Sequence, residues 1–74
     1  MTKYKGGGGV ENNLKRSREK RGFTQSEVAV AAGITDRQYR RIEKGEQDPK
    51  TKTSILIAKA LDVTVEELFP LSGV

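Results

Sequence analysis

The chain has 74 residues, a formal net charge of +4, and neither cysteine nor histidine. This length suits a single compact domain, and the missing residue types leave no disulfide framework, no thiolate metal site and no histidine general base. No apolar run approaches the roughly 20 residues of a membrane span, and no apolar stretch follows the basic N-terminus as in a secretory signal, so we expect a cytoplasmic protein without a metal or other cofactor.

Residues 1–9, MTKYKGGGG, are expected to form a flexible arm, because four consecutive glycines neither hold a helix nor bury side chains. Lys3 and Lys5 leave two interpretations open, namely contacts with phosphate groups or a disordered tail without a role, and we favour the second. Residues 10–70 are expected to form the folded domain, and residues 71–74 a C-terminal tail.

A first helix is expected to run to about Arg21, with Asn12 or Asn13 as its N-cap and Gly22 at its end. The residues expected on its buried side are Val10 and Leu14. Phe23 follows the glycine and is expected to anchor the chain in the core.

Two further helices follow at close spacing. Thr24 with Glu27 predicts a capping box at the start of the second helix, and Gly33 is expected to end it in the left-handed conformation. Thr35 is a good N-cap for a third helix, which runs to about residue 44 and is ended by Gly45. The apolar positions of this pair of helices are Val28, Ala29, Ala32, Ile34, Tyr39 and Ile42.

The last part of the chain predicts two more helices. A fourth is expected over about residues 52–61, with Ser54, Ile57, Ala58 and Leu61 on one face. Thr64 with Glu67 forms a second capping box, which opens a short fifth helix through Phe69 that Pro70 terminates. No strand-like alternation is sustained anywhere, so the predicted fold is all-α with five short helices.

The segment TQSEVAVAAGITDRQYRRIEKGE, residues 24–46, has the spacing of a helix-turn-helix unit. Two helices of about nine residues flank a three-residue turn that contains Gly33. Ala29 stands where the helices would cross and only a small side chain fits. Because all these requirements are met together, we predict a helix-turn-helix.

Charge is distributed unevenly along the chain. Residues 1–52 hold 13 basic and 7 acidic residues, a net charge of +6, whereas residues 53–74 hold 1 lysine and 3 acidic residues, a net charge of −2. This distribution suits a protein that presents one face to a polyanion. Charge alone fits equally well a small protein that lysine and arginine keep soluble.

The segments NNLKRSREKRGFTQ, GITDRQYRRIEKGEQDP and IAKALDVTVEELF resemble the Cro/repressor-type helix-turn-helix domains of phages and bacteria. The resemblance covers about residues 10–70 and implies a five-helix, lambda-repressor-like fold. It also implies a small, nucleoid-associated transcriptional regulator, expected to be a repressor or autoregulator, that places its third helix, about residues 36–44, in the major groove of double-stranded DNA. Relatives usually have an aliphatic residue at Tyr39 and apolar residues at Thr51 and Ser54.

The same resemblance assigns roles to side chains. The residues expected to contact base edges are Asp36, Arg37, Gln38, Arg40 and Arg41. Arginine matches guanine and glutamine matches adenine, whereas Asp36 either accepts from a cytosine amino group or merely caps the helix. The residues expected to contact phosphates are Gln25, Thr35, Lys44, Lys50 and Lys52. Tyr39 is expected in the core, although its hydroxyl could reach the phosphates instead.

The resemblance also implies one contact between helices of the domain and one between two copies of the protein. Arg18 and Glu43 match positions that form a structural ion pair between the first and third helices of the family. The residues expected at a homodimer interface are Leu56, Val65, Phe69 and Leu71, and such a dimer reads a near-palindromic operator. The alternative is that Phe69 and Leu71 only close the core of the monomer.

Other functions fit the sequence less well. Without histidine or cysteine no activated nucleophile is apparent, and the glycine run lacks the spacing of a phosphate-binding loop, so we expect neither catalysis nor a small-molecule substrate. A protein-interaction module on the same fold, or the regulator subunit of a toxin–antitoxin or restriction–modification system, is the alternative. Apolar anchors on the third helix would favour an interaction module, whereas Arg37, Arg40 and Arg41 favour DNA.

Overall fold

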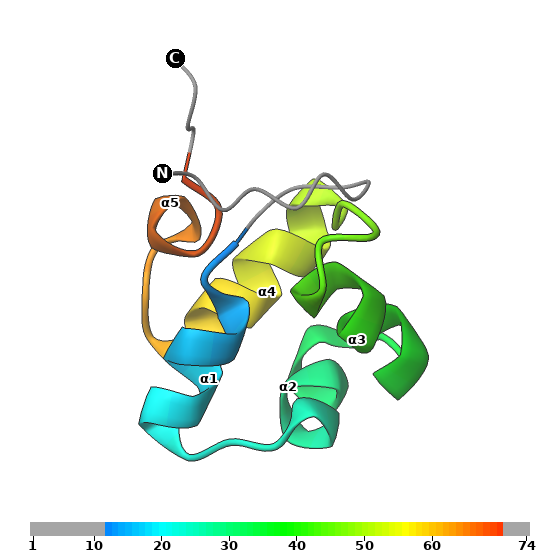
Figure 1. Ribbon diagram of the computed structural model, residues 1–74, viewed down its shortest axis with the longest axis horizontal. Coiled ribbons are helices and arrows are strands. Elements are labelled where there is room, and N and C mark those ends of the chain that lie inside the picture. Colours follow the sequence, from blue (N-terminus) through cyan, green and yellow to red (C-terminus); the bar gives the residue numbers. More distant parts are fainter. Residues whose placement is uncertain (1–11, 71–74) are drawn as a thin grey trace, which may run out of the picture.

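The computed structural model describes residues 12–70, which fold into five α-helices and contain no strand. The helices are α1 (Leu14–Arg21), α2 (Gln25–Ala32), α3 (Asp36–Glu43), α4 (Thr51–Leu61) and α5 (Val65–Leu68). The all-α, five-helix prediction is therefore confirmed, and Figure 1 shows α3 and α5 at opposite sides of the molecule. The expected arm, the expected tail, Val10 and Leu71 lie outside the described residues.

Each of α2, α3 and α5 begins with a reciprocal capping box, made by the pairs Thr24 and Glu27, Thr35 and Gln38, and Thr64 and Glu67. In each box the threonine hydroxyl accepts from a backbone N–H, and the third helical residue accepts from the threonine N–H. Two of the boxes were predicted. The box of α3 was not, because Gln38 was assigned to DNA rather than to the helix end.

Asparagines fix the start of α1 to two other helices. The side-chain oxygen of Asn12 accepts from the Leu14 N–H at 3.1 Å, while its amide donates to the carbonyl of Ile42 at 2.8 Å. Asn13 occupies the N-cap position without a side-chain capping bond, and its amide instead donates to the Glu67 carbonyl at 2.9 Å. The two asparagines therefore connect α1 to the end of α3 and to α5.

The core is formed by one face of every helix. Its ten buried apolar residues are Leu14, Val28, Ala29, Ala32, Tyr39, Ile42, Ile57, Ala58, Leu61 and Leu68. Helix α2 packs against both α3 and α4, and α4 also contacts α1 and α5. All four positions expected on the inner face of α4 are buried, including Ser54, whose hydroxyl donates to the Lys50 carbonyl at 3.2 Å. Within residues 12–70 no helix is both long and apolar enough to cross a membrane.

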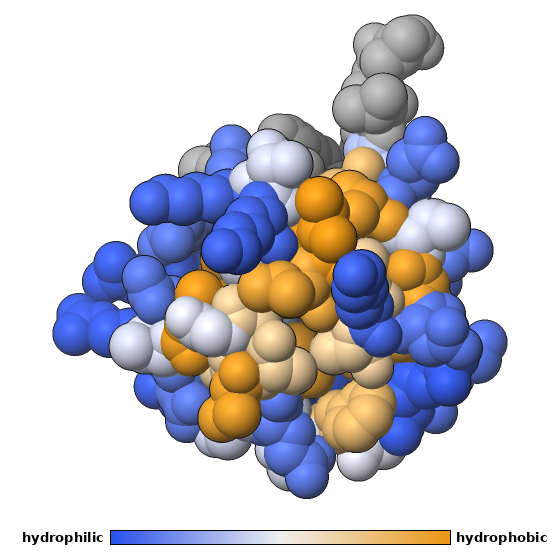
Figure 2. Space-filling model, turned by 180° about the vertical axis from the view of Figure 1, so that it is seen from behind, coloured by the Kyte–Doolittle hydropathy of each residue, from blue (hydrophilic) through white to orange (hydrophobic). Residues whose placement is uncertain are grey.

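One expected position was wrong. Phe23 is 37% exposed and does not anchor the core. It lies in the short connection after Gly22, where its N–H donates to the Arg18 carbonyl and its carbonyl accepts from the Arg18 side chain. Leu56, a residue expected at a dimer interface, is half-buried and packs against the core of the monomer. Ile55 takes the outward position and is 44% exposed. Figure 2 shows hydrophobic residues gathered on the face that lies at the rear in Figure 1.

The turn between α2 and α3 depends on Gly33, which has a φ of 71°. Its N–H donates to the Val30 carbonyl at 3.1 Å, and the next N–H, that of Ile34, donates to the Ala29 carbonyl at 3.0 Å. These bonds close the end of α2 and direct the chain into α3. The left-handed conformation predicted for Gly33 is confirmed.

We predict that Gly33→Ala lowers the free energy of unfolding by about 1–2 kcal/mol, since a Cβ is strained at this φ. A Cβ here meets no atom within 4 Å, so the cost is conformational rather than steric. Gly33→Asn should cost less, because asparagine tolerates the left-handed region. Denaturant unfolding followed by circular dichroism measures both values, and an equal loss in the two variants would contradict this explanation.

Candidate nucleic-acid interface

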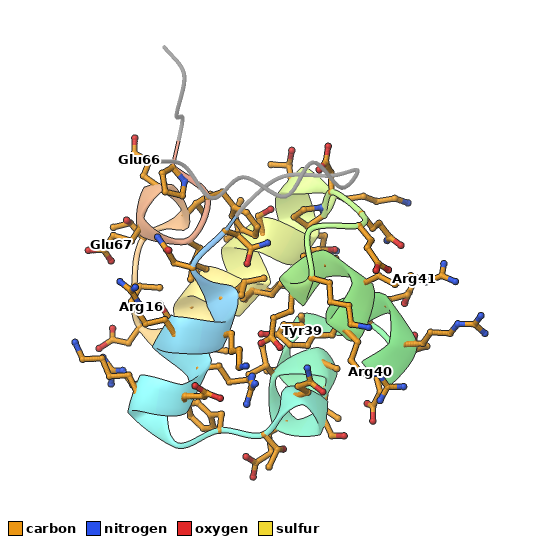
Figure 3. The ribbon with its side chains drawn as sticks, viewed as in Figure 1. Arg16, Tyr39, Arg40, Arg41, Glu66 and Glu67 are labelled. Carbon is orange, nitrogen blue, oxygen red and sulfur yellow. The ribbon has the colours of Figure 1, made fainter. Side chains whose placement is uncertain are left out.

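Helix α3 has one buried side and one charged side. Tyr39 and Ile42 face the core, and the residues exposed elsewhere on the helix are Asp36, Arg37, Gln38, Arg40 and Arg41. At about 100° per residue, Arg37 lies opposite the two core residues and points most directly outward, and Arg40 and Arg41 lie about 50° to either side of that direction. Figure 3 shows Arg40 and Arg41 extending away from the body of the molecule.

The acidic residues of α5 and the arginines of α3 lie at different sides of the fold. Arg40 and Arg41 lie at one side of the molecule, and Glu66 and Glu67 lie at the other, on α5 (Figure 3). Arg16 of α1 lies on the side of Glu67 as well (Figure 3), so basic residues are not confined to the side of α3. The exposed lysines expected at phosphates follow α3 in the chain, at Lys44, Lys50 and Lys52.

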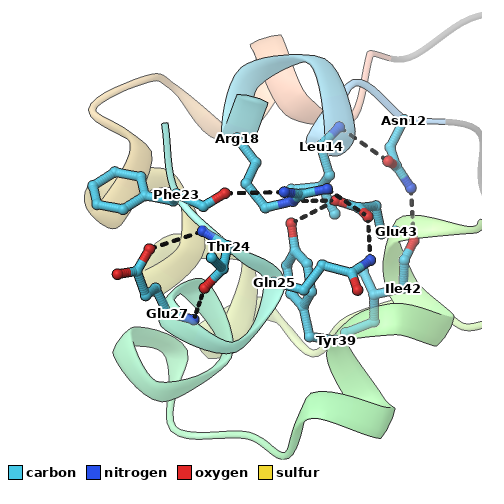
Figure 4. Close-up of polar contacts among 10 residues, drawn as sticks. All are labelled: Asn12, Leu14, Arg18, Phe23, Thr24, Gln25, Glu27, Tyr39, Ile42 and Glu43. Atoms are coloured by element: carbon cyan, nitrogen blue, oxygen red, sulfur yellow. Dashed lines mark hydrogen bonds and ion pairs between the residues drawn. The ribbon is translucent and has the colours of Figure 1, made fainter. Parts of the chain in front are cut away.

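Behind the charged side, Glu43 joins the first three helices (Figure 4). Arg18 of α1 donates from Nε to Oε2 at 2.8 Å and from Nη2 to Oε1 at 3.4 Å, so the expected ion pair is present. Gln25 of α2 donates from Nε2 to Oε1 at 2.6 Å, and the Tyr39 hydroxyl donates to Oε2 at 3.1 Å. Arg18 also donates from Nη1 to the Phe23 carbonyl at 2.9 Å, which fixes the connection to α2.

These donors decide the ionisation of Glu43. The side chain is 5% exposed, and burial alone raises its pKa, but the hydrogen bonds from Arg18, Gln25 and Tyr39 outweigh burial and hold the pKa below its ordinary value. Burial and the adjacent carboxylate raise the pKa of Tyr39, so its hydroxyl stays protonated and continues to donate. The hydrogen bond to Glu43 raises the pKa of Arg18.

The environment of Tyr39 answers the question that the sequence left open. The side chain is fully buried and its hydroxyl is bonded to Glu43 within the protein, as expected for a core residue. The hydroxyl therefore does not face a phosphate. The spacing of Tyr39 and Glu43, four residues apart on one helix, was visible in the sequence and could have predicted this contact.

Four expected contact residues have side-chain partners within the protein, namely Gln25, Thr35, Asp36 and Gln38. Gln25 is half-buried, with its amide directed to Glu43 rather than to solvent. Gln38 accepts through Oε1 from the Thr35 N–H at 3.0 Å and from the Thr35 hydroxyl at 3.3 Å. Recognition of adenine uses both the oxygen and the NH₂ of an amide. While the capping box holds, only the NH₂ of Gln38 remains for a base.

Asp36 also has a partner that the sequence did not indicate. Its carboxylate accepts a hydrogen bond from the hydroxyl of Ser26, which belongs to α2. Thr35 holds the N-cap position, so Asp36 contributes to the helix end only through its charge in the first turn. Both Asp36 and Ser26 are exposed, on the same side of the turn between α2 and α3.

We predict that Glu43 makes stability dependent on acidic pH. Because its pKa in the folded protein lies below the ordinary 4.5, its stabilising contribution is present above about pH 4.5 and is lost as the pH falls through the folded-state value. The difference in free energy of unfolding between the wild type and Glu43→Gln should therefore be largest near neutral pH and shrink below pH 4.5. Urea unfolding between pH 7 and pH 2 measures it, and a difference that does not change with pH would argue against the network.

Comparisons with known proteins agree with this geometry. The helix-turn-helix family model matches residues 14–68. An uncharacterised helix-turn-helix-type transcriptional regulator from Methanocaldococcus jannaschii is 35% identical over 60 residues, which are 81% of this chain and 91% of that protein.

Solved structures show the same arrangement of helices. The restriction–modification controller protein C.AhdI from Aeromonas hydrophila matches with a TM-score of 0.71 and 26% identity, over 77% of this chain and 86% of that one. The N-terminal DNA-binding domain of SinR from Bacillus subtilis matches with a TM-score of 0.67 and 29% identity, over 73% and 80% of the two chains. The chain therefore belongs to the helix-turn-helix family of transcriptional regulators, in its Cro/repressor-type branch.

Proposed function

We propose that this protein binds specific sequences of double-stranded DNA as a small transcriptional repressor or autoregulator, with α3 in the major groove. The observation that carries the proposal is that α3 exposes three arginines on its outer side. On its inner side Tyr39 and Ile42 are buried, and the Tyr39 hydroxyl is bonded to Glu43. A major groove about 12 Å wide admits an α-helix, and arginine pairs bidentately with guanine O6 and N7. Arg37 is the residue best placed to contact base edges, and Arg40 and Arg41 flank it.

Contacts with the phosphate backbone would set the affinity. Lys44, Lys50 and Lys52 are exposed and follow α3, and Thr35 and Gln25 stand at the starts of α3 and α2. In this proposal Gln25 donates to a phosphate through the second hydrogen of its amide, while the first remains bonded to Glu43. Helix N-termini add backbone N–H groups to such a contact.

Base contacts and phosphate contacts are expected to respond differently to mutation. Arg37→Ala or Arg41→Ala should weaken binding to a duplex selected by the wild type by about 1–3 kcal/mol, with little effect on random duplex. Lys44→Ala should weaken binding to all sequences alike and reduce the slope of log affinity against log salt by about 1. Fluorescence anisotropy at several salt concentrations measures these quantities.

Arg16→Ala is the matched control, because Arg16 is an exposed arginine of α1 that points away from α3 (Figure 3). It removes the same charge and should leave the preference for the selected duplex unchanged. Equal losses for Arg16→Ala and Arg37→Ala, on selected and random duplex alike, would show that only net charge attracts DNA.

We further propose that two copies bind one operator through the face formed by α4 and α5. Val65 and Phe69 are half-buried and pack against the core together with Leu56, so part of each remains accessible. Figure 2 shows apolar residues spread over this rear face. In this proposal the two-fold pairing sets the two α3 helices about 34 Å apart, so that they enter successive turns of the major groove of a near-palindrome.

Val65→Glu should weaken loading of the second copy by at least about tenfold, because a two-fold interface brings the introduced charges together. An acidic residue suits the first turn of α5, so the variant should remain folded. Val30→Glu is the control, since Val30 is 77% exposed and belongs to α2, not to α4 or α5. Sedimentation of each protein with a palindromic duplex counts the bound copies, and identical loading by the two variants would exclude this interface.

A further inference from the structure

The hydrogen bond between Ser26 and Asp36 places a negative charge inside an otherwise positive surface. Asp36 lies one helical turn from Arg40, at a spacing where an acidic and a basic side chain often pair. Among residues 12–70, however, the ion pairs are those of Arg18 with Glu43 and Arg21 with Asp62. The Asp36 carboxylate is held by a hydroxyl of α2 instead, and it stays exposed beside the arginines.

Neither helix capping nor folding explains this arrangement fully. Thr35 and Gln38 already complete the capping box of α3, so no backbone donor at the helix start depends on the Asp36 side chain. A carboxylate near DNA phosphates opposes binding through charge repulsion. Only a donor on the DNA that pairs with the carboxylate would offset this repulsion, and the major groove offers such donors on base edges alone.

The chemistry of the carboxylate selects among the bases. The Ser26 hydroxyl occupies Oδ2, which leaves Oδ1 as a single acceptor at a fixed place. Cytosine presents an N4 amino donor in the major groove, adenine presents an N6 donor beside the N7 acceptor, and guanine and thymine present acceptors. An ionised carboxylate is therefore attracted most to cytosine and repelled by guanine and thymine.

Building on the proposed function, we propose that Ser26 is a positioning residue that orients Asp36, and that Asp36 selects cytosine at one position of each half-site. The bond runs from α2 to the first turn of α3, so the carboxylate is directed by the packing of the two helices and not only by its own rotamer. Specificity at this position then depends on a residue that need not touch DNA.

The test is selection from a random-sequence duplex pool, followed by affinity measurements on the selected duplex and its single-base-pair variants. The wild type should enrich a motif with a cytosine whose replacement weakens binding by about tenfold. Asp36→Ala should lose this preference while the rest of the motif persists, and it should bind random duplex more tightly because a repelling charge is gone. Ser26→Ala should weaken the same preference, and Ser26→Thr, which keeps the hydroxyl, should retain it.

If Asp36→Ala selects the wild-type motif unchanged and only its thermal stability falls, Asp36 serves the helix end and the inference is wrong. If Ser26→Ala and Ser26→Thr lose the preference equally, the hydroxyl does not position Asp36. If the wild type enriches no motif at all, the DNA-binding proposal fails together with this inference.

Discussion

The carboxylate of Glu43 is the interaction on which the arrangement of the first three helices depends. Arg18 from α1, Gln25 from α2 and Tyr39 from α3 all donate to it. Burying a carboxylate is unfavourable unless its oxygens are paired and hydrogen-bonded, and here both oxygens receive donors. Because hydrogen bonds have narrow distances and angles, this network fixes the orientation of α3 more sharply than apolar contact does.

That constraint matters because the helices are short. Helices α1, α2 and α3 have eight residues each, and α3 contributes only two apolar side chains to the core. A domain of this size buries a smaller fraction of its surface than a larger one, so its stability margin is narrow. The core is supplemented by the Glu43 network on the inner side of α3 and by the capping boxes at the starts of α2, α3 and α5. Among residues 12–70, none of the arginines of the outer side forms an ion pair that would compete with a polyanion.

Much of the fold could be predicted from the sequence because its signals are local. A threonine followed three residues later by glutamate marks a helix start, and Gly22 and Gly33 mark helix ends. These signals act within one turn of chain, so they do not require knowledge of the tertiary structure. The position of Phe23 was missed because hydrophobicity alone does not show that a short connection keeps a ring at the surface.

The candidate site was less predictable, since its details depend on how α2 lies against α3. The bonds from Gln25 to Glu43 and from Ser26 to Asp36 join residues 18 and 10 positions apart, and no spacing rule relates them. Gln38 shows a different difficulty, because the same amide suits both a base and a capping box. The family resemblance correctly indicated the Arg18–Glu43 pair, but not the two further donors that complete it.

A structure of the protein bound to its selected duplex would show whether α3 reads base edges while Glu43 holds its place. We expect α3 within the major groove, Arg37 and Arg41 against base edges, and Glu43 still accepting from Arg18 and Tyr39. A complex in which α3 faces solvent, or in which the Glu43 network is broken to let α3 reach the DNA, would contradict this expectation.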